Sequence, residues 1–226
     1  GYCVAGSDAV RSEQTEQLAF YGVKVYIGAD EEKKDISKAD VVVYTDAIPA
    51  ENKELVWARA QGKKVIARAD FLGTVCNSFP HVISVAGSHG KTTCTSMCAH
   101  VLKASNVPFT AHIGGEDLTF GNFYSSGEEY LLTEACEYKK NLLKIKSEAA
   151  ILLNIDKDHM ECYQNEEDLK ECFLRYCKQA NAAFVCADDE RSAGLGDFPT
   201  FGIRSTLADY RAVDLRANGE RYSFTV

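Results

Sequence analysis

The sequence has no apolar run long enough to span a membrane, and its N-terminus lacks the basic-then-apolar pattern of a secretory signal. It also lacks a basic tract: 25 Lys and Arg are outnumbered by 33 Asp and Glu, which gives a formal net charge of −8. Nucleic acid and anionic membrane surfaces are therefore not expected as partners. The 226 residues, 46% hydrophobic and 26% charged, are typical of a globular protein with one large domain or two modest ones.

The nine cysteines contain no C-x-x-C pair, and their odd number does not fit a disulfide framework. This favours a reducing compartment, so we predict a cytoplasmic protein whose thiols pack as small hydrophobic groups. Cys94 and Cys98 are one helical turn apart, and a metal pair there is a less favoured alternative to packing. The cysteines are Cys3, Cys76, Cys94, Cys98, Cys136, Cys162, Cys172, Cys177 and Cys186.

Residues 81–95 have the pattern of a strand, a glycine loop and a helix. The apolar run at 82–86 is broken by G-S-H-G at 87–90, and residues 91–104 contain almost no helix breaker. Such a turn places backbone N–H groups and the positive end of a helix dipole around one point, which suits a phosphate. Lys91 can reach the outer phosphates of a nucleotide, and the hydroxyl of Thr92 suits Mg²⁺.

The match to the general phosphate-binding loop is incomplete. The pattern G-x-x-x-x-G-K-[ST] needs glycine at position 85, where this sequence has Val85. An alternative interpretation is a plain glycine turn with a solvated Lys91. The position of the loop between a strand and a helix favours the phosphate-binding interpretation.

Strands and helices alternate before this loop, which predicts a parallel sheet with helices on its faces. We expect strands at residues 2–5, 23–27, 41–44 and 64–67, and helices at 12–21 and 52–61. Open α/β sheets bind ligands at the carboxyl ends of their strands, although capping or surface roles explain polar residues there equally well. The polar residues at such positions include Ser7, Asp8, Thr45, Asp46, Arg68 and Asp70.

The stretch N-S-F-P at 77–80 is the best domain boundary and separates residues 1–79 from 80–226. The second part repeats the alternation and ends in a hairpin turned at Asn218-Gly219. The predicted fold class is α/β, with a Rossmann-like parallel-sheet domain followed by a P-loop α/β ATPase domain. Its expected strands lie at 109–113, 130–133, 149–153, 183–186 and 200–203, its later helix at 167–179, and its hairpin at 211–215 and 222–226.

Glu134 and His159 both fall just beyond predicted strands, on the same sheet edge as the glycine loop. Carboxylate and hydroxyl oxygens suit Mg²⁺, whereas an imidazole ligand is less usual. Taken singly, such residues are more often caps or structural groups. Their shared edge with the loop favours a functional role for both.

Three segments together resemble the central-domain signatures of the Mur ligase family: G-S-H-G-K-T-T at 87–93, E-A-C-E-Y at 134–138 and N-I-D-K-D-H at 154–159. Upstream, G-S-D at 6–8, D-A-I-P at 46–49 with Asn52 and Glu54, and Arg68-Ala69 resemble the UDP-binding domain of that family. The resemblance covers nearly the whole chain, and the combination is far more specific than any one motif. It implies ATP-dependent peptide-bond formation through an acyl phosphate in peptidoglycan precursor synthesis.

The resemblance also implies roles for particular residues. Lys91 would hold the β- and γ-phosphates and Thr92 a first Mg²⁺, while Glu134 and His159 would hold a second Mg²⁺. The expected catalytic residues are Lys91, Glu134 and His159, and the expected metal ligands are Thr92, Glu134 and His159. The expected ATP-binding residues are Gly87, Ser88, His89, Gly90, Lys91, Thr92 and Thr93, and those expected to bind the UDP end are Ser7, Asp8 and Thr45.

Within the family, the form E-A-C-E-Y favours the member that joins L-alanine to UDP-N-acetylmuramate, with ATP and Mg²⁺ as cofactors. A close alternative is the recycling member that attaches a whole peptide to UDP-N-acetylmuramate. A nucleotide-binding module without chemistry is disfavoured because Lys91, Glu134 and His159 occur together. A generic P-loop kinase is disfavoured by Val85 and by the lack of an acceptor-base motif.

The resemblance further implies segments that this sequence does not contain. The glycine loop of the UDP domain would precede Gly1, and Ala29 stands where a histidine is common. The central domain would continue beyond Val226 and be followed by a domain that helps to bind the amino acid. On this expectation the 226 residues alone are not a competent ligase.

Overall fold

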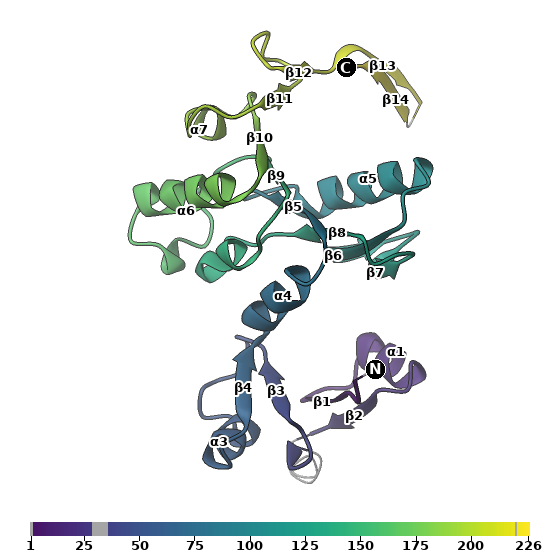
Figure 1. The fold of residues 1–226 in the computed structure, drawn as a ribbon, viewed down its shortest axis with the longest axis vertical. Helices are drawn as coiled ribbons and strands as arrows, with labels where there is room; N and C mark the ends of the chain where they lie inside the picture. The colour runs from purple at the N-terminus through teal and green to yellow at the C-terminus, as the bar shows by residue number, and fades with distance from the viewer. Residues whose placement is uncertain (1, 29–35, 220) are drawn as a thin grey trace. The chain divides into compact units, whose positions relative to one another are not determined.

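The computed structural model describes residues 2–28, 36–219 and 221–226, which form two compact units, Gly1–Phe71 and Leu72–Val226 (Figure 1). Helix α4 (Arg68–Cys76) contains the change from one unit to the other. Its later residues Leu72 and Cys76 pack with the hydrophobic core of the second unit. The domain boundary at 79/80 stays a prediction.

The described residues of the first unit contain two β-α-β segments. In the first, β1 (Ala5–Asp8) and β2 (Lys24–Ile27) pair in parallel and are joined through α1 (Glu13–Phe20). In the second, β3 (Val41–Tyr44) and β4 (Lys64–Ala67) pair in parallel and are joined through α3 (Lys53–Ala60). Both helices are one residue shorter at each end than the predicted ranges. Ser12 and Asn52 are N-caps that accept hydrogen bonds from first-turn amides.

The first strand differs from its prediction. It was expected at residues 2–5, but the strand begins at Ala5 and continues to Asp8. The reason is backbone pairing, since Gly6, Ser7 and Asp8 lie opposite Val25, Tyr26 and Ile27 of β2, whatever the polarity of their side chains. Ser7 and Asp8 are therefore the last residues of the strand rather than a loop that follows it.

The second unit contains an eight-stranded sheet in the order β12-β11-β10-β9-β5-β8-β6-β7. Every neighbouring pair is parallel except β6 and β7, which are antiparallel. The strands are β5 (His81–Ala86), β6 (Phe109–Asp117), β7 (Gly121–Ser125), β8 (Tyr130–Glu134), β9 (Ala149–Leu152), β10 (Ala182–Cys186), β11 (Thr200–Gly202) and β12 (Tyr210–Arg211). The α/β fold class is thus confirmed, with one antiparallel edge.

Two long helices cover opposite faces of this sheet, α5 (Lys91–Ala104) and α6 (Glu166–Gln179), as Figure 1 shows. The alternation along β5 explains the two cores. Val82 and Ala86 pack in the cluster that contains Leu169 and Phe173 of α6. Val85 packs on the other face with Ala99 of α5. The central strand therefore holds both helices in place relative to the loop that follows it.

Several elements are longer than predicted or were not predicted. The sequence pattern ends a strand at Gly114-Gly115, but β6 continues to Asp117 because β7 pairs with it as far as Asp117 opposite Gly121. The predicted hairpin is present as β13 (Val213–Asn218) and β14 (Arg221–Thr225), with Gly219 at φ +63° in the turn. The short elements without a prediction are β7, β12, α7 (Glu190–Ala193), and the 3₁₀ segments η1 (Tyr138–Lys144) and η2 (Met160–Cys162).

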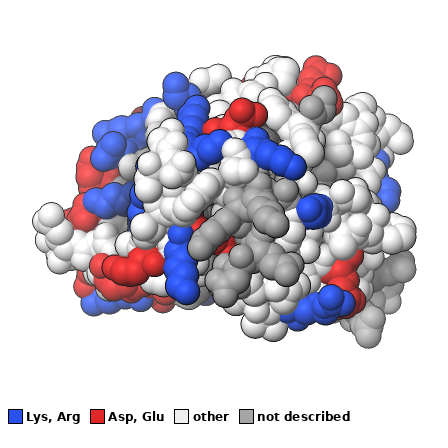
Figure 2. All heavy atoms as spheres, turned by 90° about the horizontal axis from the view of Figure 1, so that it is seen from below, with Lys and Arg blue, Asp and Glu red and all other residues white. Residues whose placement is uncertain are grey.

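The distribution of surface charge and the state of the cysteines can be compared with what the composition suggests. Basic and acidic side chains are interspersed on the face shown in Figure 2. All nine cysteines lie in the described ranges and are free thiols, and Cys94 and Cys98 pack against the core cluster that α5 covers. No helix within the described ranges combines the length and apolar character needed to cross a membrane.

Candidate active site

The loop between β5 and α5 depends on two glycines. Gly87 has φ +142°, and a Cβ there would lie 3.2 Å from the backbone N and O of Asn154. Gly90 has φ +81° and is the N-cap of α5, where it has no side chain to bind the first-turn amides. The amides at the start of α5 are therefore directed at the place where an anion would bind.

A second segment, residues 154–156, holds the other half of the loop. The Ser88 amide donates to the Asn154 carbonyl (3.1 Å), and the His89 amide donates to Asn154 Oδ1 (2.8 Å). Ser88 Oγ accepts from the Asp156 amide (2.8 Å) and donates to the Asp156 carbonyl (3.1 Å). These bonds use the amides of Ser88 and His89, so the amides of residues 90–93 are the ones left to face a phosphate.

Lys91 lies folded back over the loop. Its Nζ donates to the carbonyl oxygens of Gly87 (2.6 Å) and Ser88 (3.2 Å). The same Nζ lies 3.2 Å and 3.0 Å from Oε1 and Oε2 of Glu137. The lysine side chain is 16% exposed, and that of Glu137 is 0% exposed. The ammonium group is thus held at the loop by a buried carboxylate.

Thr92 and Glu134 both lie against Gly114 and Gly115 of β6. Glu134 Oε1 accepts from the Gly114 amide at 2.5 Å, and a Cβ on Gly114 would lie 2.5 to 2.8 Å from the Glu134 carboxylate. A Cβ on Gly115 would lie 2.9 Å from Cγ2 of Thr92. Each of the two approaches requires glycine, and the contact at Gly115 is with the methyl carbon of Thr92. Thr92 and Glu134, which the sequence predicts as metal ligands, thus each contact β6 at adjacent residues.

His159 lies in a different group of side chains. Its backbone has φ +53°, its ring packs edge-on against Tyr138 at 5.2 Å, and its Nδ1 is 3.5 Å from Oε1 of Glu161. Ligand atoms of His159, Asp158 and Glu137 lie within 4.8 Å of one another. This group does not contain Glu134. The structure therefore joins His159 to Lys91 through their common neighbour Glu137.

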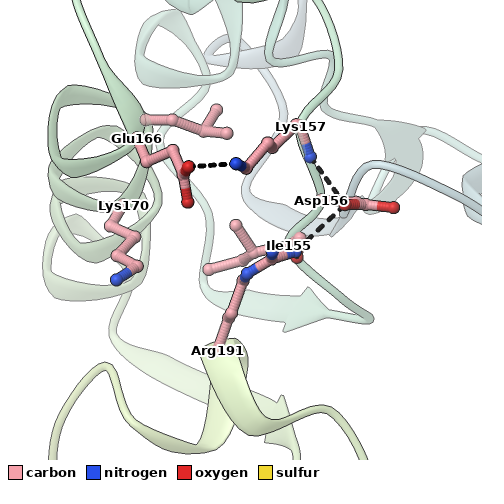
Figure 3. A pocket seen from close by; sticks show the side chains of 7 residues that line it. Ile155, Asp156, Lys157, Glu166, Lys170 and Arg191 are labelled. Atoms are coloured by element: carbon pink, nitrogen blue, oxygen red, sulfur yellow. Dashed lines mark hydrogen bonds and ion pairs between the residues drawn. The ribbon is translucent and has the colours of Figure 1, made fainter.

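The segment that carries His159 is supported from α7. Arg191 donates to the Ile155 carbonyl (3.0 Å) and to Oδ1 of Asp156 (3.0 Å), and the Ile155 amide donates to Oδ2 of Asp189 (3.2 Å). The Lys157 amide, then Arg191 and His89, hold the pKa of Asp156 below its usual value. Side chains of this segment also line a pocket, shown in Figure 3, whose lining residues are Ile155, Asp156, Lys157, Glu166, Leu169, Lys170 and Arg191.

The residues predicted for the UDP end make local contacts in the first unit. Ser7 Oγ donates to Oε2 of Glu54 at 2.6 Å, which ties β1 to α3. Oδ1 of Asp8 accepts from the Val10 amide (3.0 Å), and Oγ1 of Thr45 accepts from the Ala47 amide (3.4 Å). Ala29 lies outside the described residues.

Three residues that contact the predicted site were quoted within motifs but not assigned a role: Glu137, Asn154 and Asp156. Their signal was their place inside E-A-C-E-Y and N-I-D-K-D-H. Asn154 and Asp156 could have been selected because polar residues within a few positions of a strand end often hold the neighbouring loop. Neither the burial of Glu137 nor its contact with Lys91 can be read from the sequence.

A parallel sheet whose central strand leads through a glycine loop into a helix that begins with lysine defines a P-loop type of α/β protein. The chain belongs to the Mur ligase family. The profile of the Mur ligase middle domain matches residues 85–226, and that of the Mur ligase family catalytic domain matches residues 1–80.

Curated relatives agree with this assignment. The chain is 41% identical over 195 residues to UDP-N-acetylmuramate–L-alanine ligase of Clostridium beijerinckii, which covers 84% of this chain and 42% of that protein. It is 40% identical over 228 residues to the ligase of the same name from Clostridium perfringens, which covers 97% of this chain and 50% of that protein. The chain thus spans about half the length of the curated relatives that it matches.

Solved structures show the same fold. The structure of UDP-N-acetylmuramate-alanine ligase from Thermotoga maritima superposes with a TM-score of 0.83 at 26% identity, over 95% of this chain and 49% of that one. A ligase from Neisseria meningitides that takes UDP-N-acetylmuramate and L-alanyl-γ-D-glutamyl-meso-diaminopimelate superposes with a TM-score of 0.84 at 22% identity, over 99% and 76%. At 22% sequence identity, the similarity to this second structure supports the fold only.

Proposed function

We propose that this chain provides the nucleotide-binding and UDP-substrate-binding parts of a ligase that joins L-alanine to UDP-N-acetylmuramate in peptidoglycan precursor synthesis. The observation that carries the proposal is the meeting of three segments at one edge of the sheet of the second unit. Lys91 of the loop contacts Glu137 of E-A-C-E-Y, and Ser88 and His89 contact Asn154 and Asp156 of N-I-D-K-D-H. The relatives named for this reaction support the choice of substrates.

The proposed reaction has two steps, and neither changes an oxidation state. The lactyl carboxylate of UDP-N-acetylmuramate attacks the γ-phosphorus of ATP, which gives an acyl phosphate and ADP. The amine of L-alanine then attacks the acyl carbon, so that an amide forms and inorganic phosphate and a proton leave. Transfer of this kind requires positioning and neutralisation of charge more than covalent chemistry by the protein.

The chain supplies parts for the first step. The first-turn amides of α5 and the positive end of its dipole would bind phosphate oxygens, and Lys91 would neutralise charge on the outer phosphates. Ser88 and His89 act indirectly, because their bonds to residues 154–156 fix the shape of the loop. In the first unit, Ser7, Asp8 and Thr45 are the proposed contacts for the UDP end of the substrate, within a domain proposed to end at residue 79.

Mg²⁺ fits the residues at the Gly114–Gly115 contact. Thr92 offers a hydroxyl and Glu134 a carboxylate, the hard oxygen ligands that this ion prefers. Thr92 is the proposed ligand of a first Mg²⁺, and Glu134 and His159 are the proposed ligands of a second. When bound, the ions would neutralise phosphate charge and orient the carboxylate that attacks.

The proposal is tested by incubating the full-length protein with UDP-N-acetylmuramate, ATP, Mg²⁺ and a panel of amino acids and short peptides. Phosphate release that requires L-alanine, with a product heavier by one alanine residue, supports the proposal. Turnover with a peptide but not with L-alanine would instead support the recycling reaction. Nucleotide binding without phosphate release under any condition would favour a binding module without chemistry.

A further inference from the structure

Glu137 is the one charged residue among the buried polar residues in the described part of the chain. Its backbone is held firmly, since its carbonyl accepts from the Lys140 amide at 2.8 Å and from the hydroxyl of Tyr163. The turn that follows is strained, because Lys139 and Lys140 have φ of +50° and +59°, which non-glycine residues rarely adopt. The fold thus accepts a costly turn where it places a buried carboxylate.

Both oxygens of this carboxylate contact one partner, Nζ of Lys91. The three ammonium protons of Lys91 are shared among Glu137 and the carbonyls of Gly87 and Ser88. A buried charge without a partner is strongly unfavourable, so the two side chains hold one another in a single arrangement. A lysine normally has many rotamers, and ordering it on ligand binding costs affinity.

An alternative role for Glu137 is to bind a cation together with Asp158 and His159. The ligand atoms of these three residues lie within 4.8 Å of one another. The geometry disfavours this role. Both carboxylate oxygens of Glu137 already contact the ammonium group of Lys91, so a divalent cation bound there would lie close to that group. Repulsion between the two cations would then have to be overcome by displacement of the lysine.

We propose that Glu137 is a positioning residue that acts through Lys91. It keeps the ammonium group over the glycine loop, so that a triphosphate meets a charge already in place. On binding, phosphate oxygens replace the carbonyls of Gly87 and Ser88 as partners of Lys91, while the contact with Glu137 is kept. This inference rests on the proposed function only in taking the loop as the triphosphate site.

The test measures nucleotide affinity by calorimetry, with Mg²⁺ and either the non-hydrolysable analogue adenylyl imidodiphosphate or AMP. Glu137→Gln keeps the size of the side chain and removes its charge. We expect it to weaken binding of the triphosphate analogue about ten-fold and to leave AMP binding unchanged, because only the outer phosphates meet Lys91. Glu137→Asp, which restores the charge on a shorter side chain, should recover part of the loss.

A double-mutant cycle shows whether Glu137 acts through the lysine. In the background Lys91→Met, the further change Glu137→Gln should cause no additional loss of analogue affinity. A matched control is Glu167→Gln, which removes the carboxylate of another lysine pair, Lys170 with Glu167 at 3.1 Å, and should leave analogue affinity unchanged.

Three results would overturn the proposal: an unchanged analogue affinity in Glu137→Gln, equal losses for the analogue and AMP, or additive losses in the cycle. Should Glu137→Gln fail to fold, Glu137→Asp alone decides, because a selective loss for the analogue supports positioning and no loss contradicts it. None of these measurements uses UDP-N-acetylmuramate or L-alanine. Failure of the ligase reaction would therefore be seen separately, as normal analogue binding and normal coupling without alanine-dependent turnover.

Discussion

Asn154 and His89 exchange two hydrogen bonds: the His89 amide donates to Oδ1 of Asn154 (2.8 Å), and Nδ2 of Asn154 donates to the His89 carbonyl (3.0 Å). The asparagine lies two residues after the end of β9, and the histidine lies in the loop after β5, the neighbouring strand. One side chain therefore joins the glycine loop to the segment that leads to His159. The shape of the loop is set by this contact as well as by its glycines.

Asn154→Ala should loosen the loop. Loss of two hydrogen bonds to one side chain is expected to lower the free energy of unfolding by about 1–2 kcal/mol and to weaken nucleotide binding. Denaturant unfolding and calorimetry measure the two effects. Asn122→Ala, at an exposed position on β7, is the control and should change neither. Full nucleotide affinity in Asn154→Ala would show that the loop keeps its shape without the asparagine.

Gly114→Ala should affect the metal more than the fold. The new Cβ would lie 2.5 to 2.8 Å from the Glu134 carboxylate, which is the end of a flexible side chain and can move aside. The cost in stability is therefore expected to be small, while the Mg²⁺ concentration for half-maximal activity should rise. Asn122→Ala, at an exposed position on β7, is the control. An unchanged Mg²⁺ requirement would argue that Glu134 does not bind the ion in this position.

Glu134→Gln and His159→Gln should each raise the Mg²⁺ requirement of the ligase, because each removes a proposed ligand. Asp158→Asn distinguishes this site from the neighbouring group of Glu137, Asp158 and His159. We expect Asp158→Asn to have the smaller effect. A shift in Mg²⁺ dependence as large as that of His159→Gln, with Glu134→Gln unchanged, would place the ion in the neighbouring group instead.

We expect protonation of Asp117 to contribute to the acid unfolding of the second unit. The Ser96 hydroxyl and the amides of Thr119 and Phe120 donate to its carboxylate, and these bonds, that of Ser96 first, lower its pKa from 3.8 to about 2. Because the folded pKa is the lower one, the stabilisation is complete above pH 4 and is lost as the pH falls toward 2. Asp117→Asn should flatten the fall in stability over this window, as measured by denaturant unfolding at a series of pH values. An unchanged slope would contradict the assignment.

Lys91→Ala should abolish turnover and leave binding of UDP-N-acetylmuramate nearly intact, since the lysine lies in the second unit and the proposed contacts for UDP lie in the first. Calorimetry with the UDP substrate and a phosphate-release assay separate the two effects. Equal loss of both would contradict the proposed division of labour between the two units.

Much of the site could be predicted because its signals are local. The strand, glycine loop and helix at 81–104 follow from an apolar run, two glycines and a stretch without helix breakers, and β5 and α5 have the predicted bounds. The sequence could not show that β6 runs past Gly114 and Gly115, because that extension depends on pairing with β7. For the same reason Ser7 and Asp8 belong to β1, although their side chains are polar and exposed.

The contacts between motifs were beyond the sequence for a different reason. The sequence pattern places Glu134 and His159 after two strands whose carboxyl ends meet at the same edge of the sheet. It does not show which side chains turn toward one another. In the structure Glu134 contacts Gly114, whereas His159 lies with Glu137 and Asp158. The backbone of Glu137 is held by the Lys140 amide in a turn where Lys139 and Lys140 have positive φ, and the sequence carries no glycine there as a signal.

The most direct test of the account is the electron density of the protein crystallised with adenylyl imidodiphosphate and Mg²⁺. We predict a triphosphate over the amides of residues 90–93, Nζ of Lys91 at its outer phosphates, one Mg²⁺ at Thr92 and a second at Glu134 and His159. A triphosphate bound away from this loop, or an ion at Glu137 and Asp158 with Lys91 displaced, would contradict it.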